Sequence, residues 1–115
     1  MIPIHSNSRC FFYTKSTDMR NSFDGLSAIV SSQMSGNLIS GDVFIFMNRK
    51  QNFIKLLVFD RNGFWLCAKR LEEGCFHSLA HSSTSLSLSY DELLMFIEGV
   101  DFTSIKRKKR YKRMP

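Results

Sequence analysis

The stretch from residue 43 to residue 70 constrains the fold most strongly. It contains two apolar runs, at 43–47 and 53–59, and a third segment of strand length at 64–70, separated by two short polar segments. The first polar segment, 48–52, has the length of a hairpin loop. The second ends in Asn62-Gly63, a strong hairpin signal because both residues tolerate the positive φ of a type I′ turn. The pattern predicts an antiparallel three-stranded meander.

The segment before the meander predicts a strand followed by a helix. Residues 9–15 are aromatic and bounded by polar residues, which is typical of a strand. Ser16 or Thr17 offers an N-cap for a helix over 18–34, and Asp18 suits the positive end of its dipole. Gly25 is expected to permit close packing against the sheet. Apolar residues three or four positions apart form one face of this helix: Met19, Phe23, Leu26, Val30 and Met34.

A Ser-rich connection and a second helix follow the meander. Residues 77–88 are expected to contain at most a short edge strand, Ser89 begins a capping box with Glu92, and Gly99 ends the helix. The predicted fold is α+β with the order β-α-β-β-β-α. An antiparallel meander of three to four strands packs on helix 18–34, and the second helix covers an edge or end of the sheet. Residues 1–105 are expected to form one small domain, and residues 106–115 a disordered basic tail.

The positive charge of the chain is unevenly distributed. The chain has 115 residues and a net charge of +6, and residues 106–113 contain seven of its sixteen Lys and Arg residues. Eleven Phe, three Tyr and one Trp provide the bulk for a core without a metal or disulfide. No apolar run approaches the roughly 18 residues that span a bilayer. The first residues lack the basic and apolar regions of a secretory signal, and the odd number of cysteines, three, argues against a disulfide framework. We therefore expect a cytoplasmic protein without a membrane partner.

The acidic, cysteine and histidine residues do not predict a catalytic centre. Two-metal phosphoryl-transfer enzymes need carboxylates that converge on two metal ions about 3.5–4 Å apart. Most aspartates instead lie beside predicted caps or turns: Asp18, Asp24, Asp42, Asp60 and Asp101. Cys75, His77 and His81 have a spacing similar to zinc ligands, but their segment is Ser-rich and lacks a fourth ligand. We therefore expect no enzymatic activity, no metal or other cofactor, and no small-molecule substrate.

The basic tail points to contact with nucleic acid. Positive side chains in a dense run attract phosphate through counterion release and need no defined fold. Such a tail supplies affinity but no choice of sequence. The alternative is a solvated tail that only aids solubility or binds any polyanion. The candidate DNA-binding residues of the tail are Lys106, Arg107, Lys108, Lys109, Arg110, Lys112 and Arg113.

The predicted hairpin tips offer further DNA candidates. Arg49 and Lys50 lie at one tip and Arg61 at the next, with Asn48 or Asn62 available for base edges. Antiparallel strands can present such groups to a groove of the duplex. The alternative is that these tips are charged simply because they face water.

Two other residues are candidates for contact with a protein partner. Phe64 and Trp65 point to opposite faces of one predicted strand, and an exposed Trp65 would be typical of a protein–protein hot spot. Arg20 lies four residues before Asp24, a spacing that also suits an ion pair on a helix.

Two motifs resemble a known family. Residues 17–20, Thr-Asp-Met-Arg, and 23–26, Phe-Asp-Gly-Leu, are similar to the TDMRxxFDGL signature of TnpB-type accessory proteins, encoded by the second reading frame of insertion-sequence-66 elements. The resemblance continues in order through 40–46, 48–49, 55–57, 63–66, 69–74, 93–94 and 97–99. It departs from the family pattern at 15–16, 21–22 and 67–68, where the family commonly has Gly-Pro, Lys-Gly and an aromatic pair.

The resemblance implies a role in DNA transposition beside a separate, larger transposase. On this basis we expect a non-catalytic accessory protein that binds DNA weakly through its tail and binds the transposase or another accessory protein through its folded domain. Because Arg20 lies within the signature, a partner contact at this residue is also implied. The main alternative is a protein–protein interaction module of the transposition complex that never touches DNA, and an enzymatic role ranks third.

Overall fold

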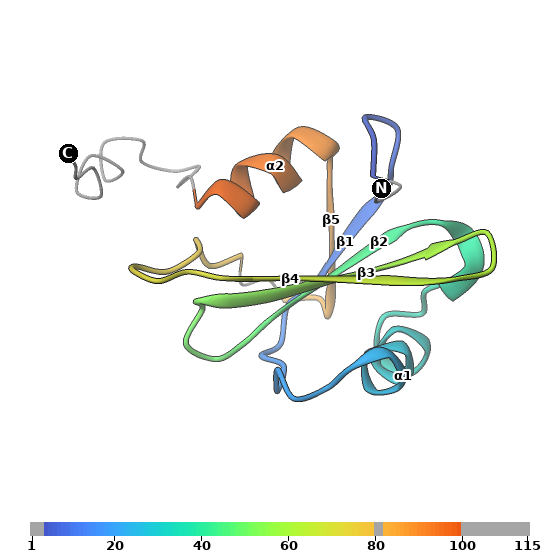
Figure 1. Cartoon of the computed structure of the whole chain (residues 1–115), viewed down its shortest axis with the longest axis horizontal. Helices are drawn as coiled ribbons and strands as arrows, with labels where there is room; N and C mark the ends of the chain where they lie inside the picture. Colours follow the sequence, from blue (N-terminus) through green and yellow to red (C-terminus); the bar gives the residue numbers. More distant parts are fainter. Residues whose placement is uncertain (1–3, 80–81, 100–115) are drawn as a thin grey trace.

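The computed structural model describes residues 4–79 and 82–99. Within these residues a single sheet carries one helix on each face (Figure 1). The helices are α1 (Phe23–Gln33) and α2 (Tyr90–Glu98), with a short 3₁₀ helix at Leu38–Ser40. The strands are β1 (Cys10–Tyr13), β2 (Val43–Met47), β3 (Phe53–Asp60), β4 (Gly63–Arg70) and β5 (Ser85–Leu88). None of the helices in the described ranges is long and apolar enough to cross a membrane.

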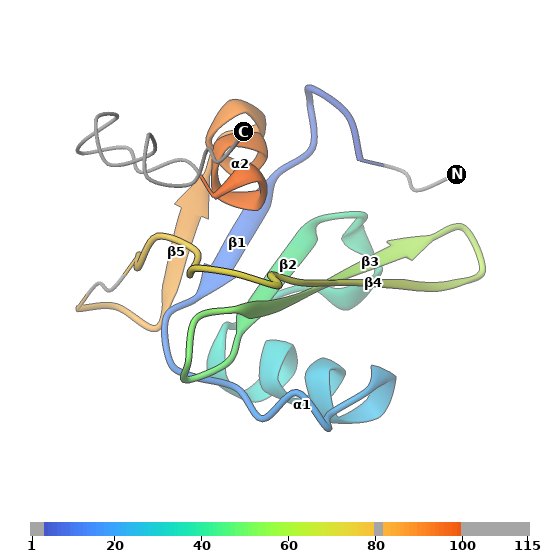
Figure 2. The same ribbon diagram turned by 60° about the vertical axis from the view of Figure 1, so that its left-hand side comes forward.

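The described sheet has five strands in the order β4-β3-β2-β1-β5. The antiparallel meander β2-β3-β4 is confirmed, and β5 is the predicted short edge strand. The expectation of a wholly antiparallel sheet of three to four strands is wrong, because β1 pairs with β2 in parallel. A parallel pair needs a crossover connection, and α1 lies in the chain between these two strands (Figure 2).

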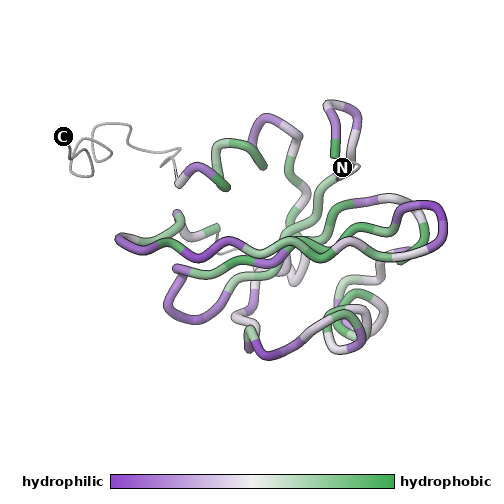
Figure 3. The backbone as a smooth tube through the Cα atoms, viewed as in Figure 1, coloured by the Kyte–Doolittle hydropathy of each residue, from purple (hydrophilic) through white to green (hydrophobic). Residues whose placement is uncertain are grey.

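Both faces of the sheet are covered. Phe12 and Ile45 point toward α2, where the rings of Phe12 and Phe96 lie 5.4 Å apart. Phe46 and Leu57 point the other way and belong to the core cluster that includes the buried side chains of α1. The central strand β2 therefore reads as a continuous apolar run (Figure 3). The second helix packs Leu93 and Phe96 onto the face that carries Phe12 and contacts the edge strand β5, which agrees with the expectation that it covers an edge of the sheet.

The first helix begins at Phe23, five residues later than predicted. The carboxylate of Asp18 accepts a hydrogen bond from the backbone N–H of Arg20, and the carbonyl of Asp18 accepts one from the N–H of Asn21. Residues 18–21 therefore form a tight turn in place of a first helical turn. Ser22, not Ser16 or Thr17, takes the N-cap position, and its side chain makes no capping hydrogen bond.

Three members of the predicted apolar face are buried: Leu26, Val30 and Met34. Met19 precedes the helix, and Phe23 at its start is 43% exposed. A Cβ on Gly25 would meet the side chain of Asn21, so this glycine accommodates the preceding turn and not the sheet. Close packing on the sheet requires glycine at Gly36 instead, where a Cβ would lie 2.8 Å from the ring of Phe44.

The β3–β4 hairpin differs from the predicted type I′ turn. Asp60 pairs with Gly63, so the two loop residues are Arg61 and Asn62, one position earlier than Asn-Gly. Arg61 has the positive φ, 60°, whereas Gly63 already belongs to β4 and is not in the left-handed region. The predicted capping box between Ser89 and Glu92 is confirmed. The predicted tail, 106–115, lies outside the described residues.

Candidate nucleic-acid interface

The two hairpin tips that carry the candidate basic residues lie at opposite ends of the sheet (Figure 2). Arg49 and Lys50 precede β3, whereas Arg61 follows it. Since β3 has eight residues, the tips are about 26 Å apart at roughly 3.3 Å per residue. Arg49, Lys50 and Arg61 therefore do not form one continuous patch.

A group of free positive charges lies where the parallel strands β1 and β2 end. Lys15 follows β1, and Arg49 and Lys50 follow β2. The backbone N–H of Thr17 donates to the carbonyl of Met47, at 2.8 Å, which holds the segment after β1 against the end of β2. We call Lys15, Arg49 and Lys50 the basic corner. All three side chains are exposed and make no hydrogen bond or ion pair within the described part of the chain.

Two adjoining hollows run along the basic corner. Residues 16–19 and 48–50 line an open hollow of about 520 Å³. A smaller one of about 180 Å³ includes Lys15 and Arg49 in its lining, and Ser16, Asn48 and Arg49 line both. Thr17, which lines the larger hollow, is 5% exposed, and its hydroxyl has no hydrogen-bond partner in the described residues.

The turn that precedes α1 is held by an ion pair. Arg20 Nη2 lies 2.6 Å from Asp18 Oδ2, and Arg20 Nε lies 3.1 Å from both carboxylate oxygens. The side-chain hydrogen bonds from Arg20, assisted by its backbone N–H, lower the pKa of Asp18 from 3.8 to about 2. The predicted Arg20–Asp24 pair is wrong, since Arg20 precedes the helix. The positive charge of Arg20 is thus matched by Asp18 beside the corner.

Asn48 is not free to read base edges. Its side-chain oxygen accepts hydrogen bonds from the N–H groups of Asn52 and Phe53, and its amide nitrogen donates to Asn52 Oδ1. The side chain therefore closes the loop between β2 and β3 and orients Arg49 and Lys50. The other predicted candidate, Asn62, is exposed at the opposite tip with Arg61.

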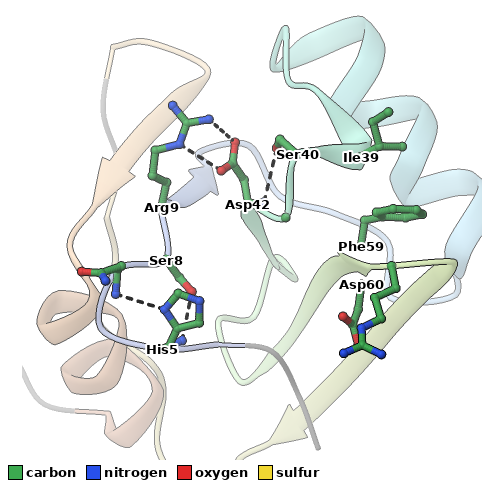
Figure 4. A pocket seen from close by; sticks show the side chains of 11 residues that line it. His5, Ser8, Arg9, Ile39, Ser40, Asp42, Phe59 and Asp60 are labelled. Carbon is green, nitrogen blue, oxygen red and sulfur yellow. Dashed lines mark hydrogen bonds and ion pairs between the residues drawn. The ribbon is translucent and has the colours of Figure 1, made fainter.

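The opposite end of the sheet carries an open pocket of about 580 Å³ with balanced charges (Figure 4). Arg9 and Asp42 point toward one another in a two-bonded pair, with nitrogen–oxygen distances of 3.0 and 2.9 Å. Arg61 and Asp60 also line the pocket. Two arginines thus face two aspartates, so this pocket lacks the positive excess of the basic corner.

The partner candidate Trp65 lies near this opposite end. It is 40% exposed, and its indole N–H donates to Asp60 Oδ2 at 3.1 Å. Phe64 points to the other face, where its ring packs on that of Phe59 at 5.2 Å. The expected divergence of Phe64 and Trp65 is therefore confirmed.

Three aspartates of the described domain pair with other side chains. Asp18 pairs with Arg20, Asp42 with Arg9, and Asp60 accepts from Trp65. In the ranges 4–79 and 82–99, no three Cys, His, Asp or Glu side chains gather in a way that could hold a metal ion. His81 and Asp101 lie outside these ranges.

Comparison with known proteins identifies related sequences. The sequence model of a family described as IS66 Orf2-like proteins matches residues 8–107. "Uncharacterized protein y4jC" of Sinorhizobium fredii is 30% identical over 100 residues, which cover 87% of this chain and 86% of that protein. "Uncharacterized protein y4hO" of the same species is 29% identical over 102 residues, 89% of each chain. No solved structure matches the chain.

Proposed function

The chain belongs to the family of IS66 Orf2-like proteins, and on this premise we propose that it contacts DNA and works beside a separate transposase encoded by the same element. Family membership makes it an accessory protein associated with transposition. We assign it a non-catalytic role, because Asp18, Asp42 and Asp60 each pair with another side chain, and no three acidic, histidine or cysteine side chains of the described residues gather as a metal-dependent centre requires.

The contact with DNA is carried by one observation, the seven basic residues at 106–113. Phosphate neutralisation by such a run gives affinity for any duplex. We treat residues 1–105 as the accessory domain and 106–115 as its basic tail, with DNA-binding roles for the tail and for Arg49 and Lys50. Arg61 lies at the far end of the sheet, where it lines a pocket with Asp42 and Asp60, and it is not part of this proposed contact.

The placement of α2 supports this assignment. Lys69 near the end of β4 donates from Nζ to the carbonyl of Ile97 at 2.9 Å, so the last turn of α2 lies beside the end of β4. Arg70 in turn pairs with Phe53, the first residue after the 48–52 loop. The helix therefore ends at the same end of the sheet as the basic corner (Figure 1). The basic run begins seven residues after Gly99.

A second candidate function is a protein–protein interaction module without DNA contact. Trp65 favours it, because a half-exposed indole whose N–H is already bonded to Asp60 is a rigid apolar anchor. We propose Trp65 and Arg20 as contacts for the transposase or for another accessory protein. Trp65 lies near the end of the sheet opposite the basic corner, so a partner contact there is compatible with DNA binding at the corner, whereas Arg20 lies beside the corner through its pair with Asp18.

Fluorescence anisotropy on the terminal repeats of the element and on scrambled duplexes tests the proposed function. The full-length protein is compared, over a series of salt concentrations, with a variant of the same length in which the seven Lys and Arg residues of 106–113 are replaced by Gln. We expect the full-length protein to bind both duplexes. When the logarithm of the binding constant is plotted against the logarithm of the salt concentration, the basic tail should contribute about −6 to the slope. Absence of binding at low salt would overturn the DNA role. Binding to purified transposase that weakens on Trp65→Ala would then support the interaction module.

A further inference from the structure

We propose that the basic corner is a phosphate-binding site of the folded domain, at which Lys15, Arg49 and Lys50 hold the backbone of duplex DNA. This inference rests on the proposed DNA contact and adds to it. A basic tail gives affinity without orientation, whereas phosphate contacts from a rigid body set its register and direction on the duplex. The corner would therefore determine how the domain sits on DNA.

The rigid placement of the three charges is the first argument. Lys15 and Arg49 line the same 180 Å³ hollow although they are distant in sequence, and Arg49 and Lys50 share the larger one. The Thr17–Met47 backbone hydrogen bond fixes the segment that carries Lys15. The side chain of Asn48 fixes the loop that carries Arg49 and Lys50. The positions from which the three side chains project are thus set before DNA arrives.

The local charge balance is the second argument. The carboxylate that lines the larger hollow is Asp18, and Arg20 pairs with it at 2.6 Å. The positive charges of Lys15, Arg49 and Lys50 are therefore not cancelled within the described residues. At the other end of the sheet, Arg9 and Arg61 face Asp42 and Asp60. The described residues contain nine basic and nine acidic side chains, so the corner is a local group of uncancelled positive charges in a domain without net charge.

Hydroxyl groups provide the third argument. Ser16 is exposed and lines both hollows, and Thr17 lines the larger one. The hydroxyl of Thr17 is buried without a hydrogen-bond partner in the described residues. Because that hydroxyl is closed to solvent, the exposed Ser16 provides the hydroxyl that is open to a phosphate oxygen. Serine, threonine, lysine and arginine are side chains that commonly contact phosphate in protein–DNA complexes.

The test compares single substitutions in the full-length protein. Arg49→Gln at the corner and Arg61→Gln at the far tip form a matched pair, because each removes one arginine charge from an exposed hairpin loop. Lys15→Gln and Lys50→Gln extend the series. The dissociation constant for a 20-base-pair duplex is measured by anisotropy between 50 and 300 mM salt, and circular dichroism checks that each variant is folded.

We expect each corner substitution to weaken binding and to reduce the magnitude of the log–log salt slope by about 0.9. Arg61→Gln should leave the slope unchanged. Equal effects of Arg49→Gln and Arg61→Gln would show that only net charge matters and would overturn the site. If the wild-type protein binds and no corner variant differs from it, the site is again overturned while the tail-mediated contact stands. If the wild-type protein binds no duplex, both proposals fail.

Discussion

Lys55 Nζ lies 2.8 Å from the carbonyl oxygen of Met19, so a side chain of β3 holds the turn that precedes α1. The same ammonium donates to the carbonyl of Asn21, also at 2.8 Å. The two carbonyls belong to a segment that could otherwise have continued the helix toward its N-terminus. Lys55 thus stabilises the turn in which Asp18 and Arg20 meet.

Replacing Lys55 by Met should destabilise the domain. Met keeps most of the apolar stem but removes both charge-assisted hydrogen bonds, which are worth about 1.5–3 kcal/mol in proteins. Urea unfolding followed by circular dichroism measures the change in the free energy of unfolding. Lys15→Met, at an exposed lysine with no partner in the described residues, is the control and should change it by less than about 0.5 kcal/mol. Equal effects of the two substitutions would contradict the role of Lys55.

The ion pair between Asp18 and Arg20 should be visible in a titration. The folded-state pKa of Asp18, about 2, is below its ordinary value of 3.8, because Arg20 hydrogen-bonds the charged form. The pair therefore stabilises the fold above about pH 3.8, and this contribution is lost as the pH falls through about 2. Carboxyl-carbon NMR measures the pKa directly. Arg20→Gln should return it toward 3.8, and an unchanged value would show that the guanidinium is not the cause.

Ser89→Ala should destabilise the domain by about 1 kcal/mol, in a range of roughly 0.5–2 kcal/mol. The Ser89 hydroxyl accepts from the Glu92 N–H at 3.1 Å, and the Glu92 carboxylate accepts from the Ser89 N–H at 2.8 Å. Thermal or urea unfolding measures the loss. Ser87→Ala, on the exposed face of β5, is the matched control. A loss for Ser89→Ala no larger than the control's would show that the capping box adds no stability.

The cysteines should differ sharply in their reaction with thiol reagents. Cys75 is exposed, whereas Cys10 is buried, and its burial, with a smaller effect from the charge of Asp42, raises its pKa to about 11. Burial also raises the pKa of the partly buried Cys67. At pH 8 we expect iodoacetamide to label Cys75 in the native protein and Cys10 only after unfolding, as read by peptide mass spectrometry. Rapid native labelling of Cys10 would contradict its burial.

Local patterns were enough to predict part of the fold. The meander follows from three segments of strand length with polar separators, and the second helix from the Ser89–Glu92 spacing, because each signal is complete within about ten residues. The start of α1 could not be predicted in this way. The local sequence around Asp18 and Arg20 is compatible both with the first turn of a helix and with a tight turn. The contact from Lys55, which is distant in sequence, stabilises the tight turn.

Only part of the candidate site could be predicted from the sequence. Arg49 and Lys50 could be found because basic residues in a polar loop between strands are expected to be exposed. Nothing in the sequence near Lys15 distinguishes it from other exposed lysines. It lies beside Arg49 only because β1 pairs with β2. The separation of Arg61 from Arg49 also follows only from the antiparallel course of the strands.

By itself the sequence determined the identity of the elements, the resemblance to a transposition accessory family and the concentration of charge in the last residues. Periodicity, caps and turn residues act between neighbours in the chain, so they can be recognised without coordinates. Tertiary structure alone decided the parallel pairing of β1 with β2, the placement of a helix on each face, and the meeting of Lys15 with Arg49 and Lys50. These features depend on contacts between segments distant in sequence, whose free energy comes from burying both faces of one sheet.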